Sequence, residues 1–493
     1  MNHVSTLCGY LPLLGNVAAD AAESGAEAAS ASGAREVFIQ ICYLAASVLF
    51  ILGLKGLTAP DKARRGMQLA AIGMLVAIIG TLLNAQIVSF VWIIIGLIIG
   101  SGIGAAISIW MPMTAIPQRT AISHAFGALA ATLVGISHFH EHYGDISHVE
   151  MAALGFEVMF GSLTITGSLM AFGKLQGILP SAPITYKFQN ESTISLFVLA
   201  VLVFIYLIFN PLSWFAFWAM VLLGLAVGVL IVVPIGGADM PVVISLLNSY
   251  AGLASSATGF ALQNNVLIIA GALDGASGFL LSILMSKAMN RSFANVLFGA
   301  FGAPAAAGAA AETGADKTVR SVSVEDAAIQ LAYARQVIVV PGYGMAVAQA
   351  QHSVRELAEL IEERGGEVKY AIHPVAGRMP GHMNVLLAEA NVAYDKLFEM
   401  DEINGEFGRA DVALIIGAND VVNPAARNDQ SSPIFGMPIL NADQAKSIIV
   451  LKRSMNPGFA GIENALFYNP KCAILFGDAK SSLTKLVSAV KTA

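Results

Sequence analysis

The amino-acid sequence predicts two parts in one chain: a polytopic helical membrane domain of about nine transmembrane helices, followed by an α/β domain with a doubly wound parallel sheet. The distribution of charge marks the division. Residues 37–290 hold sixteen Asp, Glu, Lys and Arg in 254 positions, whereas residues 294–493 hold thirty-eight in 200. A soluble domain has about one charged residue in four. Only the second part comes near that composition.

Nine apolar segments, each near the length that spans a bilayer, account for the first part. They cover 37–57, 66–84, 87–110, 119–137, 150–173, 193–210, 213–234, 241–262 and 266–289. A bend at Pro112 and Pro117 separates the third segment from the fourth. Glycines recur within the third and ninth segments, and small residues let membrane helices approach closely. We therefore expect a tightly packed helix bundle.

The loops between these segments are unequal in charge. Basic residues gather on one side: Lys55, Lys62, Arg64, Arg65, Arg119, Lys174, Lys187, Lys287 and Arg291. The other side holds Glu141, Asp145, Glu150 and Asn210. Because cytoplasmic loops carry an excess of Lys and Arg, nine crossings place the N-terminus outside and the C-terminal domain in the cytoplasm.

The remaining boundaries follow from composition. Residues 1–36 are acidic, rich in Ala, Ser and Gly, and lack the basic start of a secretory signal, so we expect a short apolar stretch followed by a tail that is disordered or of no assigned structure. The membrane domain then covers 37–291, an Ala/Gly-rich linker covers 292–335, and the α/β domain covers 336–493. The formal net charge of −6 and the lack of a basic patch argue against a nucleic-acid partner. Three scattered cysteines give no disulfide framework.

Strand and helix patterns alternate in the C-terminal part, which is typical of a parallel sheet. The predicted strands are Val337–Val340, Val368–Ile372, Val412–Ile416, Ile448–Leu451 and Ala473–Phe476. The predicted helices are Ala346–Arg364 and a closing helix at Ser481–Val490.

A glycine turn follows the first of these strands. It reads Pro341-Gly342-Tyr343-Gly344-Met345-Ala346-Val347 and opens a helix. Two glycines permit a tight turn and the close approach of a pyrophosphate to a helix N-terminus, although Val347 replaces the third glycine of the dinucleotide fingerprint. In this strand–turn–helix context, the turn predicts a Rossmann-like nucleotide-binding domain.

Two further strand ends bear on which dinucleotide binds. The second strand ends at His373-Pro374 with Arg378 close behind, where NAD-binding proteins place an acid for the ribose 2′-hydroxyl. Lys452-Arg453-Ser454 follows a later strand. Such cations and hydroxyls suit a 2′-phosphate and favour NADP(H). The alternative is that Lys452 and Arg453 simply face water.

Acidic residues end two more strands. Asp420 closes Gly417-Ala418-Asn419-Asp420, and it either meets the nicotinamide end or caps a turn. Gly477-Asp478-Ala479-Lys480 ends the last strand, and Asp478 is equally suited to be a helix N-cap.

Ionisable and polar side chains inside membrane segments are rare and usually functional. They are His124 in the fourth segment, Glu157 in the fifth, Asn248 in the eighth and Asp274 in the ninth, with Asp239 just before the eighth. An imidazole exchanges protons near neutral pH. The alternative for His124 is a buried histidine that only packs helices together. His138, His140 and His142, which surround Glu141, either bind a metal on an extended segment or are solvated loop histidines.

With these motifs identified, residues 37 to 493 resemble the β subunit of the proton-translocating NAD(P) transhydrogenase. Five motifs in one order carry the resemblance. They are the glycine turn continued as Ala348-Gln349-Ala350-Gln351, then Gly377-Arg378-Met379-Pro380-Gly381-His382, then Gly417-Ala418-Asn419-Asp420, then Lys452-Arg453-Ser454-Met455-Asn456-Pro457-Gly458-Phe459-Ala460-Gly461, and Gly477-Asp478-Ala479-Lys480.

The resemblance implies a bacterial inner-membrane enzyme, a proton-translocating transhydrogenase of the re/si-specific type. This subunit would bind NADP(H), and a partner α subunit would bind NAD(H), in a dimer of such α/β units. Hydride would pass directly between the two nicotinamides while a proton crosses the membrane, and no side chain would act on the hydride.

The resemblance also implies roles by position. His124 would relay protons, Asn248 would be its polar partner, and Asp239 would couple the two domains. Glu157 is assigned to the same relay as an intramembrane acid. Asp420 would lie near the nucleotide, and Lys452 and Arg453 would clamp the 2′-phosphate under a lid. This chain has Phe459 where the family often carries Tyr in that lid.

The rival interpretation is a transporter or channel regulated by a dinucleotide-binding domain. Neither a carbonyl-filter sequence nor an internal repeat supports it.

Overall fold

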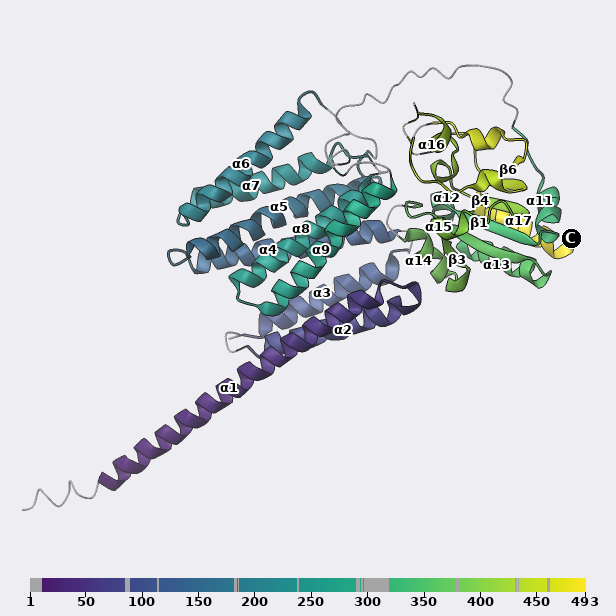
Figure 1. Ribbon diagram of the computed structural model, residues 1–493. Coiled ribbons are helices and arrows are strands. Elements are labelled where there is room, and N and C mark those ends of the chain that lie inside the picture. Colours follow the sequence, from purple (N-terminus) through teal and green to yellow (C-terminus); the bar gives the residue numbers. More distant parts are fainter. Residues whose placement is uncertain are drawn as a thin grey trace, which may run out of the picture. The chain divides into compact units, whose positions relative to one another are not determined.

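The computed structural model describes residues 11–84, 89–112, 115–180, 184, 186–236, 239–289, 293, 296, 319–377, 381–430, 432, 434–458 and 462–493 (Figure 1). The chain divides into two compact units. One unit comprises Met1–Ala105 and Gln263–Ala270, and the other comprises Ala106–Leu262 and Gly271–Ala493.

Helix α1 runs from Leu11 to Gly56 and pairs with helix α2, Pro60–Leu82. The pairing is antiparallel, because Gly66 of α2 lies against Gly53 while Gly80 lies against Cys42. From Leu11 onward, the residues of the expected tail over 1–36 are helical and belong to α1. The physical reason is their alanine content, because alanine has the highest helix propensity.

Seven more long helices follow in the membrane part. They are α3 (Val91–Trp110), α4 (Ile116–Glu141), α5 (His148–Gln176), α6 (Gln189–Phe209), α7 (Trp214–Val232), α8 (Met240–Ala261) and α9 (Asn265–Ala288). Within the described ranges, nine helices are long and apolar enough to cross a membrane, which confirms the nine predicted segments.

Helix α5 is the centre of its bundle. It packs against α4, α6, α7 and α8, and more than half of its residues are buried. Its first turn is fixed by a capping box, in which Ser147 and Glu150 satisfy each other's backbone N–H groups. Glycines make the close contacts possible: Gly224 and Gly228 of α7 touch the backbone of α5.

The C-terminal domain is built on a six-stranded sheet in the order β3-β2-β1-β4-β5-β6, and all its neighbouring strands are parallel. The strands are β1 (Gln336–Pro341), β2 (Glu367–Ile372), β3 (Leu397–Glu399), β4 (Val412–Ile416), β5 (Ser447–Lys452) and β6 (Cys472–Phe476). The strand order reverses direction between β1 and β4, and open sheets of this kind bind ligands at that point, beyond the carboxyl ends of the strands. The predicted doubly wound sheet is confirmed.

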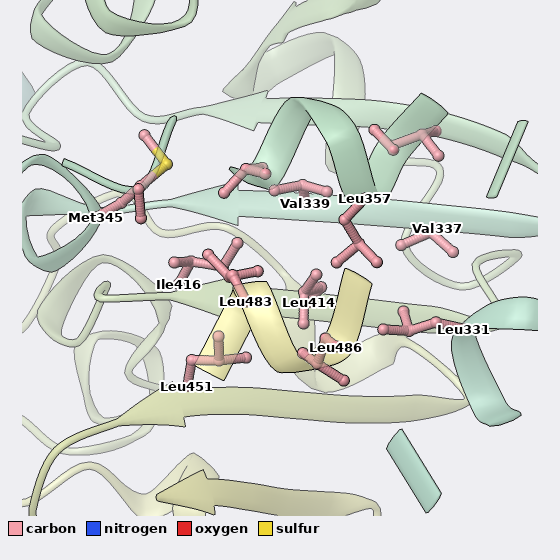
Figure 2. Close-up of a cluster of buried hydrophobic side chains, with 14 of the residues drawn as sticks. Leu331, Val337, Val339, Met345, Leu357, Leu414, Ile416, Leu451, Leu483 and Leu486 are labelled. Carbon is pink, nitrogen blue, oxygen red and sulfur yellow. The ribbon is translucent and has the colours of Figure 1, made fainter. Parts of the chain in front are cut away.

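Helices and short helical turns connect these strands. They are α11 (Val324–Ala332), α12 (Tyr343–Val347), α13 (Gln351–Glu363), α14 (His382–Glu389), η3 (Tyr394–Lys396), α15 (Met400–Ile403), η4 (Asp420–Val422), α16 (Ala425–Asn428), η5 (Ala442–Gln444), η6 (Ala465–Tyr468) and α17 (Ala479–Thr492). Alternate residues of each central strand enter opposite cores. Val337 and Val339 meet α11, α13 and α17, as Figure 2 shows for Leu331, Leu357 and Leu483. Ile338 and Val340 meet the other core, with Phe407 and Phe467.

Two predicted boundaries are wrong. The expected helix Ala346–Arg364 is two helices, because the chain turns between α12 and α13, where Gln349 has a φ of 49°. The linker also ends earlier than residue 335. Ser321 bridges to Ile474, and the amphipathic helix α11 packs on α17, so residues from 319 belong to the domain.

Candidate functional site

All five motif loops lie at one edge of the sheet. They follow β1, β2, β4, β5 and β6. Because all the strands are parallel and adjacent, their carboxyl ends share this edge. The sequence-predicted residues are thereby brought together, apart from Arg378, Met379, Pro380, Phe459 and Ala460, which lie outside the described residues.

The loop after β1 is hydrogen-bonded to the loop after β4. The N–H of Gly342 donates to the carbonyl of Ile416, and the N–H of Gly344 donates to that of Gly417, each at 2.9 Å. A Cβ atom on Gly344 would lie 2.7 Å from the Cα of Gly417, and one on Gly342 would overlap the backbone of Ala418. The two glycines of the turn therefore permit close contact between two loops. Their N–H groups already have protein acceptors.

The side chains of the predicted nucleotide site divide into buried and exposed groups. Met345, Ala346 and Ala479 belong to one hydrophobic core and Ala418 to the other, so only their backbones are available at the edge (Figure 2). Val347 is exposed, and Tyr343 is half-buried with its ring 6.4 Å from that of His382.

Lys452 lies at this edge, at the end of β5. Its ammonium is 4.3 Å from the ring centre of Phe467, which is a cation–π geometry. Partial burial lowers the pKa of Lys452, and the nearby Asp420 carboxylate opposes that shift. Arg453 and Ser454 follow on the exposed side. The protein thus orients the ammonium of Lys452, whereas the guanidinium of Arg453 beside it faces outward.

The segment after β5 returns over the loop after β4. A Cβ atom on Gly458 would lie 2.6 Å from both the amide nitrogen of Asn419 and a carboxyl oxygen of Asp420. Asn464, which lies beyond the end of this segment, donates its amide hydrogen to the backbone carbonyl of Asn419 at 2.9 Å and so holds the same loop. Asp420 therefore lies between Gly458 and Lys452 rather than capping an isolated turn.

The outer two loops are shaped by neighbouring side chains. Gly377 has a φ of 116°, and a Cβ there would lie 2.6 Å from His382. At the last strand, the carboxylate of Asp478 accepts from the N–H of Ser481 at 3.2 Å. Asp478 is therefore the N-cap of α17, one of the two readings open from the sequence, and Lys480 is exposed beside it.

The side chain that follows β2 is turned into the domain rather than toward the nucleotide edge. His373 is buried, and its Nε2 lies 2.8 Å from the carbonyl of Pro438, while its Nδ1 accepts from the N–H of Val375 at 3.2 Å. These partners fix the neutral tautomer with the proton on Nε2. Burial lowers the pKa of His373 to about 4. His373 thus joins β2 to the loop before η5.

In the membrane part, the predicted relay residues lie on different helices. His124 on α4 is half-buried, and its Nδ1 has no hydrogen-bond partner among the described residues. Glu157 on α5 is fully buried, beside Gly135 of α4 and Thr258 of α8, and its oxygens likewise lack a partner of ordinary geometry within the described ranges. Asp239 is the residue before α8. The amide of Asn248 donates to a carboxyl oxygen of Asp274 at 3.0 Å.

The histidines near Glu141 do not form the extended segment that a metal reading required. His138 and His140 lie in the last turn of α4, and His142 follows it. The Nε2 of His138 lies 2.7 Å from a carboxyl oxygen of Glu150 on α5. No group of three metal-ligating side chains occurs among the described residues.

Three residues of the site have no signal in the sequence. Asn464 and Phe467 lie beyond the last residue of the motif that follows β5, and their contacts with Asn419 and Lys452 depend on how the chain returns to the sheet edge. Lys174 was assigned to a loop, but it is buried in α5 and donates to the carbonyls of Val233 and Ile235. A buried lysine beside a helix end is visible only once the helices are packed.

Comparison with known proteins agrees with this architecture. The model of the family described as NAD(P) transhydrogenase beta subunit matches residues 39–489. The chain is 48% identical over 455 residues to the NAD(P) transhydrogenase subunit beta of Rhodospirillum rubrum, a match that covers 91% of this chain and 98% of that protein. The same protein from a named strain of that species gives the same values. The resemblance drawn from the five motifs is confirmed: this chain belongs to the NAD(P) transhydrogenase beta subunit family.

Proposed function

We propose that this chain binds NADP(H) at the carboxyl edge of its sheet and works with an α subunit that binds NAD(H). Together they form a proton-pumping transhydrogenase of the re/si-specific type. One observation carries the proposal: the loops after β1, β4, β5 and β6 meet at one edge, with Lys452 oriented there and Arg453 exposed beside it.

The residues at this edge suit a 2′-phosphorylated dinucleotide. Lys452 and Arg453 supply positive charge, Ser454 supplies a hydroxyl, and no acid follows β2, where His373 is turned inward. The glycines of the turn after β1 allow it to lie directly against the loop after β4, at the edge where the pyrophosphate would bind. The bound nicotinamide supplies the hydride chemistry, and the protein supplies position and electrostatics.

Hydride transfer requires the two nicotinamides in near-contact, so this chain contributes orientation rather than an acid or base. Asp420, held between Gly458 and Lys452, places a carboxylate beside the ammonium that would meet the phosphate. Nucleotide occupancy therefore changes the electrostatic balance of this pair. Such a change biases a conformational equilibrium that a second site can share.

In the membrane domain, His124, Glu157 and Asn248 would carry or orient the proton, and Asp239 would couple the two domains. Their support is physical: ionisable and polar groups inside membrane spans are costly and are retained for function. The subunit would lie in a bacterial inner membrane with its N-terminus outside and its α/β domain in the cytoplasm, as part of a dimer of α/β units.

Titration of the purified full chain with NADPH and with NADH tests the nucleotide assignment. We expect selective binding of NADPH, which K452Q and R453A should reduce. The matched control is K471Q, which removes an exposed lysine at the opposite, amino end of β6. Equal affinity for the two nucleotides, or equal effects of all three variants, would contradict the proposal and favour a dinucleotide-regulated transporter.

A further inference from the structure

An acid and an amide are paired between the last two membrane helices. The Nδ2 of Asn248 on α8 donates to Oδ1 of Asp274 on α9 at 3.0 Å. Both residues lie inside helices that are long and apolar enough to cross a membrane. Because a carboxylate can only accept hydrogen bonds, the NH₂ end of the amide faces the acid whenever the acid is ionised.

Small residues bring the two helices close enough for this pair. A Cβ atom on Gly278 would lie 2.9 Å from the amide nitrogen of Asn248, so the missing side chain makes room for the amide. One turn away, a side chain on Gly252 would overlap the backbone of Gly275, and the hydroxyl of Ser249 donates to the Gly275 carbonyl at 2.7 Å. The helix backbones are in contact on both sides of the pair, which fixes the Asn248–Asp274 distance.

The structure describes no cationic partner for the charge of Asp274. Among the described residues, no Lys, Arg or His forms an ion pair with it. An unpaired carboxylate in a membrane is costly, and helix packing alone does not require one. The side chain is also exposed at the surface of this chain. It is therefore not enclosed by the α8–α9 contact, and a proton donor that lies against this surface can reach it without rearrangement of that contact.

We propose that Asp274 is a proton-binding residue on the proton route, taking up and releasing a proton at Oδ2 while Oδ1 keeps the hydrogen bond from Asn248. Uptake forms an Oδ2–H bond as the same proton leaves hydronium or a neighbouring acid, and release reverses the step without electron transfer. Oδ1 accepts from the amide in both states, so Asn248 holds the carboxyl group in one orientation throughout the cycle. This places a proton-binding group on α9 and assigns Asn248 the role of orienting it.

The proposal rests on the proposed function, so its test needs one measurement that does not depend on turnover. Infrared difference spectra of the full chain in a bilayer, recorded between alkaline and acidic pH, report protonated carboxyl groups directly. Other titratable groups in these spans include His124 on α4, Glu157 and Lys174 on α5, Tyr250 on α8 and Lys287 on α9. E157Q is therefore measured in parallel, so that the C=O band of Glu157 is distinguished from the band of Asp274.

We expect D274N to remove one protonated-carboxyl C=O band. N248A should keep that band but move it to higher wavenumber, because Oδ1 loses its hydrogen-bond donor. S277A is the matched control, since this hydroxyl on the same helix bonds only the backbone carbonyl of Asp274. A D274N spectrum identical to that of the wild type would overturn the proposal.

The second measurement is proton uptake per hydride transferred by the complete α/β complex in sealed vesicles. D274N should lower this ratio severalfold, and D274E should restore part of it, whereas NADPH affinity stays unchanged. An unchanged ratio in D274N would overturn the proposal even if the band were lost. Absence of proton movement in the wild-type complex would refute the proposed function instead, and the infrared band would then decide whether Asp274 binds a proton.

Discussion

The ammonium of Lys452 lies 4.3 Å from the ring centre of Phe467, a side chain that is itself buried in the core beneath the sheet edge. The charge that would meet a 2′-phosphate is thus positioned by a core residue. The packing of Phe467 in the core therefore determines where the ammonium of Lys452 lies at the sheet edge.

F467L should weaken NADPH binding about twofold to fivefold, because a cation–π contact contributes roughly 0.5–1 kcal/mol. NADH binding should change little. F407L is the control, since Phe407 is a buried phenylalanine of the same core that has no contact with Lys452. Equal losses of NADPH affinity in both variants, measured by titration of the full chain, would show that core damage rather than Lys452 orientation is responsible.

Gly417 should tolerate no side chain. Its φ is +67°, a left-handed conformation that costs other residues about 1–2 kcal/mol, and a Cβ there would overlap the backbone of Gly344. G417A should therefore lower thermal stability and NADPH affinity together. G405A is the matched control, because nothing lies within 4 Å of a Cβ atom at that position and its φ is not in the left-handed range. A similar unfolding temperature for G417A and G405A would contradict this account.

His373 should make the α/β domain sensitive to acid. Its folded pKa of about 4 lies below the ordinary value of about 6.5, so the folded state binds the proton less readily than the unfolded state does. The stabilisation is complete above pH 6.5 and is lost as the pH falls through 4, by roughly 3 kcal/mol in total.

Hydrogen exchange of β2 and of the segment around Pro438, corrected for intrinsic rates, measures this loss. Exchange should accelerate between pH 6.5 and 4 in the wild type. In H373Q, whose amide can still donate to the Pro438 carbonyl but does not titrate, the additional acceleration should disappear. The same pH dependence in H373Q would exclude His373 as its origin.

The fold was predictable where periodicity and charge are strong. The nine membrane segments and five of the six strands follow from apolar runs of the right length. Strand β3 was missed because it has three residues, and none of them is buried. The break after α12 was missed because Ala348 and Ala350 favour helix, and only the packing of the loop after β4 against Gly344 reveals the turn.

The site was predictable as a set of loops but not as a set of contacts. A parallel sheet places all carboxyl ends on one edge, which unites the motif loops without knowledge of any side chain. The Lys452–Phe467 contact, the inward direction of His373 and the Asn248–Asp274 hydrogen bond depend on tertiary packing. No local pattern in the sequence encodes them.

Lys174 should be required for the connection that leads from α7 toward Asp239. It is buried and donates to the carbonyls of Val233 and Ile235, just beyond the last turn of α7. K174M would leave the carbonyl of Ile235 without its lysine donor and that of Val233 with only the N–H of Ile184, and an unsatisfied buried group costs about 1–3 kcal/mol. We expect lower thermal stability in detergent and reduced coupled turnover. The exposed Lys187 provides the control variant K187M, and equal stability of the two variants would argue against this role.

A variant of His124 best distinguishes an effect on proton coupling from an effect on nucleotide binding. It lies in a membrane helix, half-buried, with one ring nitrogen unpartnered among the described residues, so the ring can accept a proton without breaking an existing bond at that atom. H124A should largely abolish proton-coupled turnover of the α/β complex in vesicles. The affinity of the full chain for NADPH should be unchanged, because the nucleotide edge is built from other strands and loops.

H140A is the matched control, since it removes an exposed histidine from the end of the same helix. Proton translocation at the wild-type rate in H124A would remove His124 from the route, whereas loss of NADPH binding would indicate that the variant damages the fold rather than the relay.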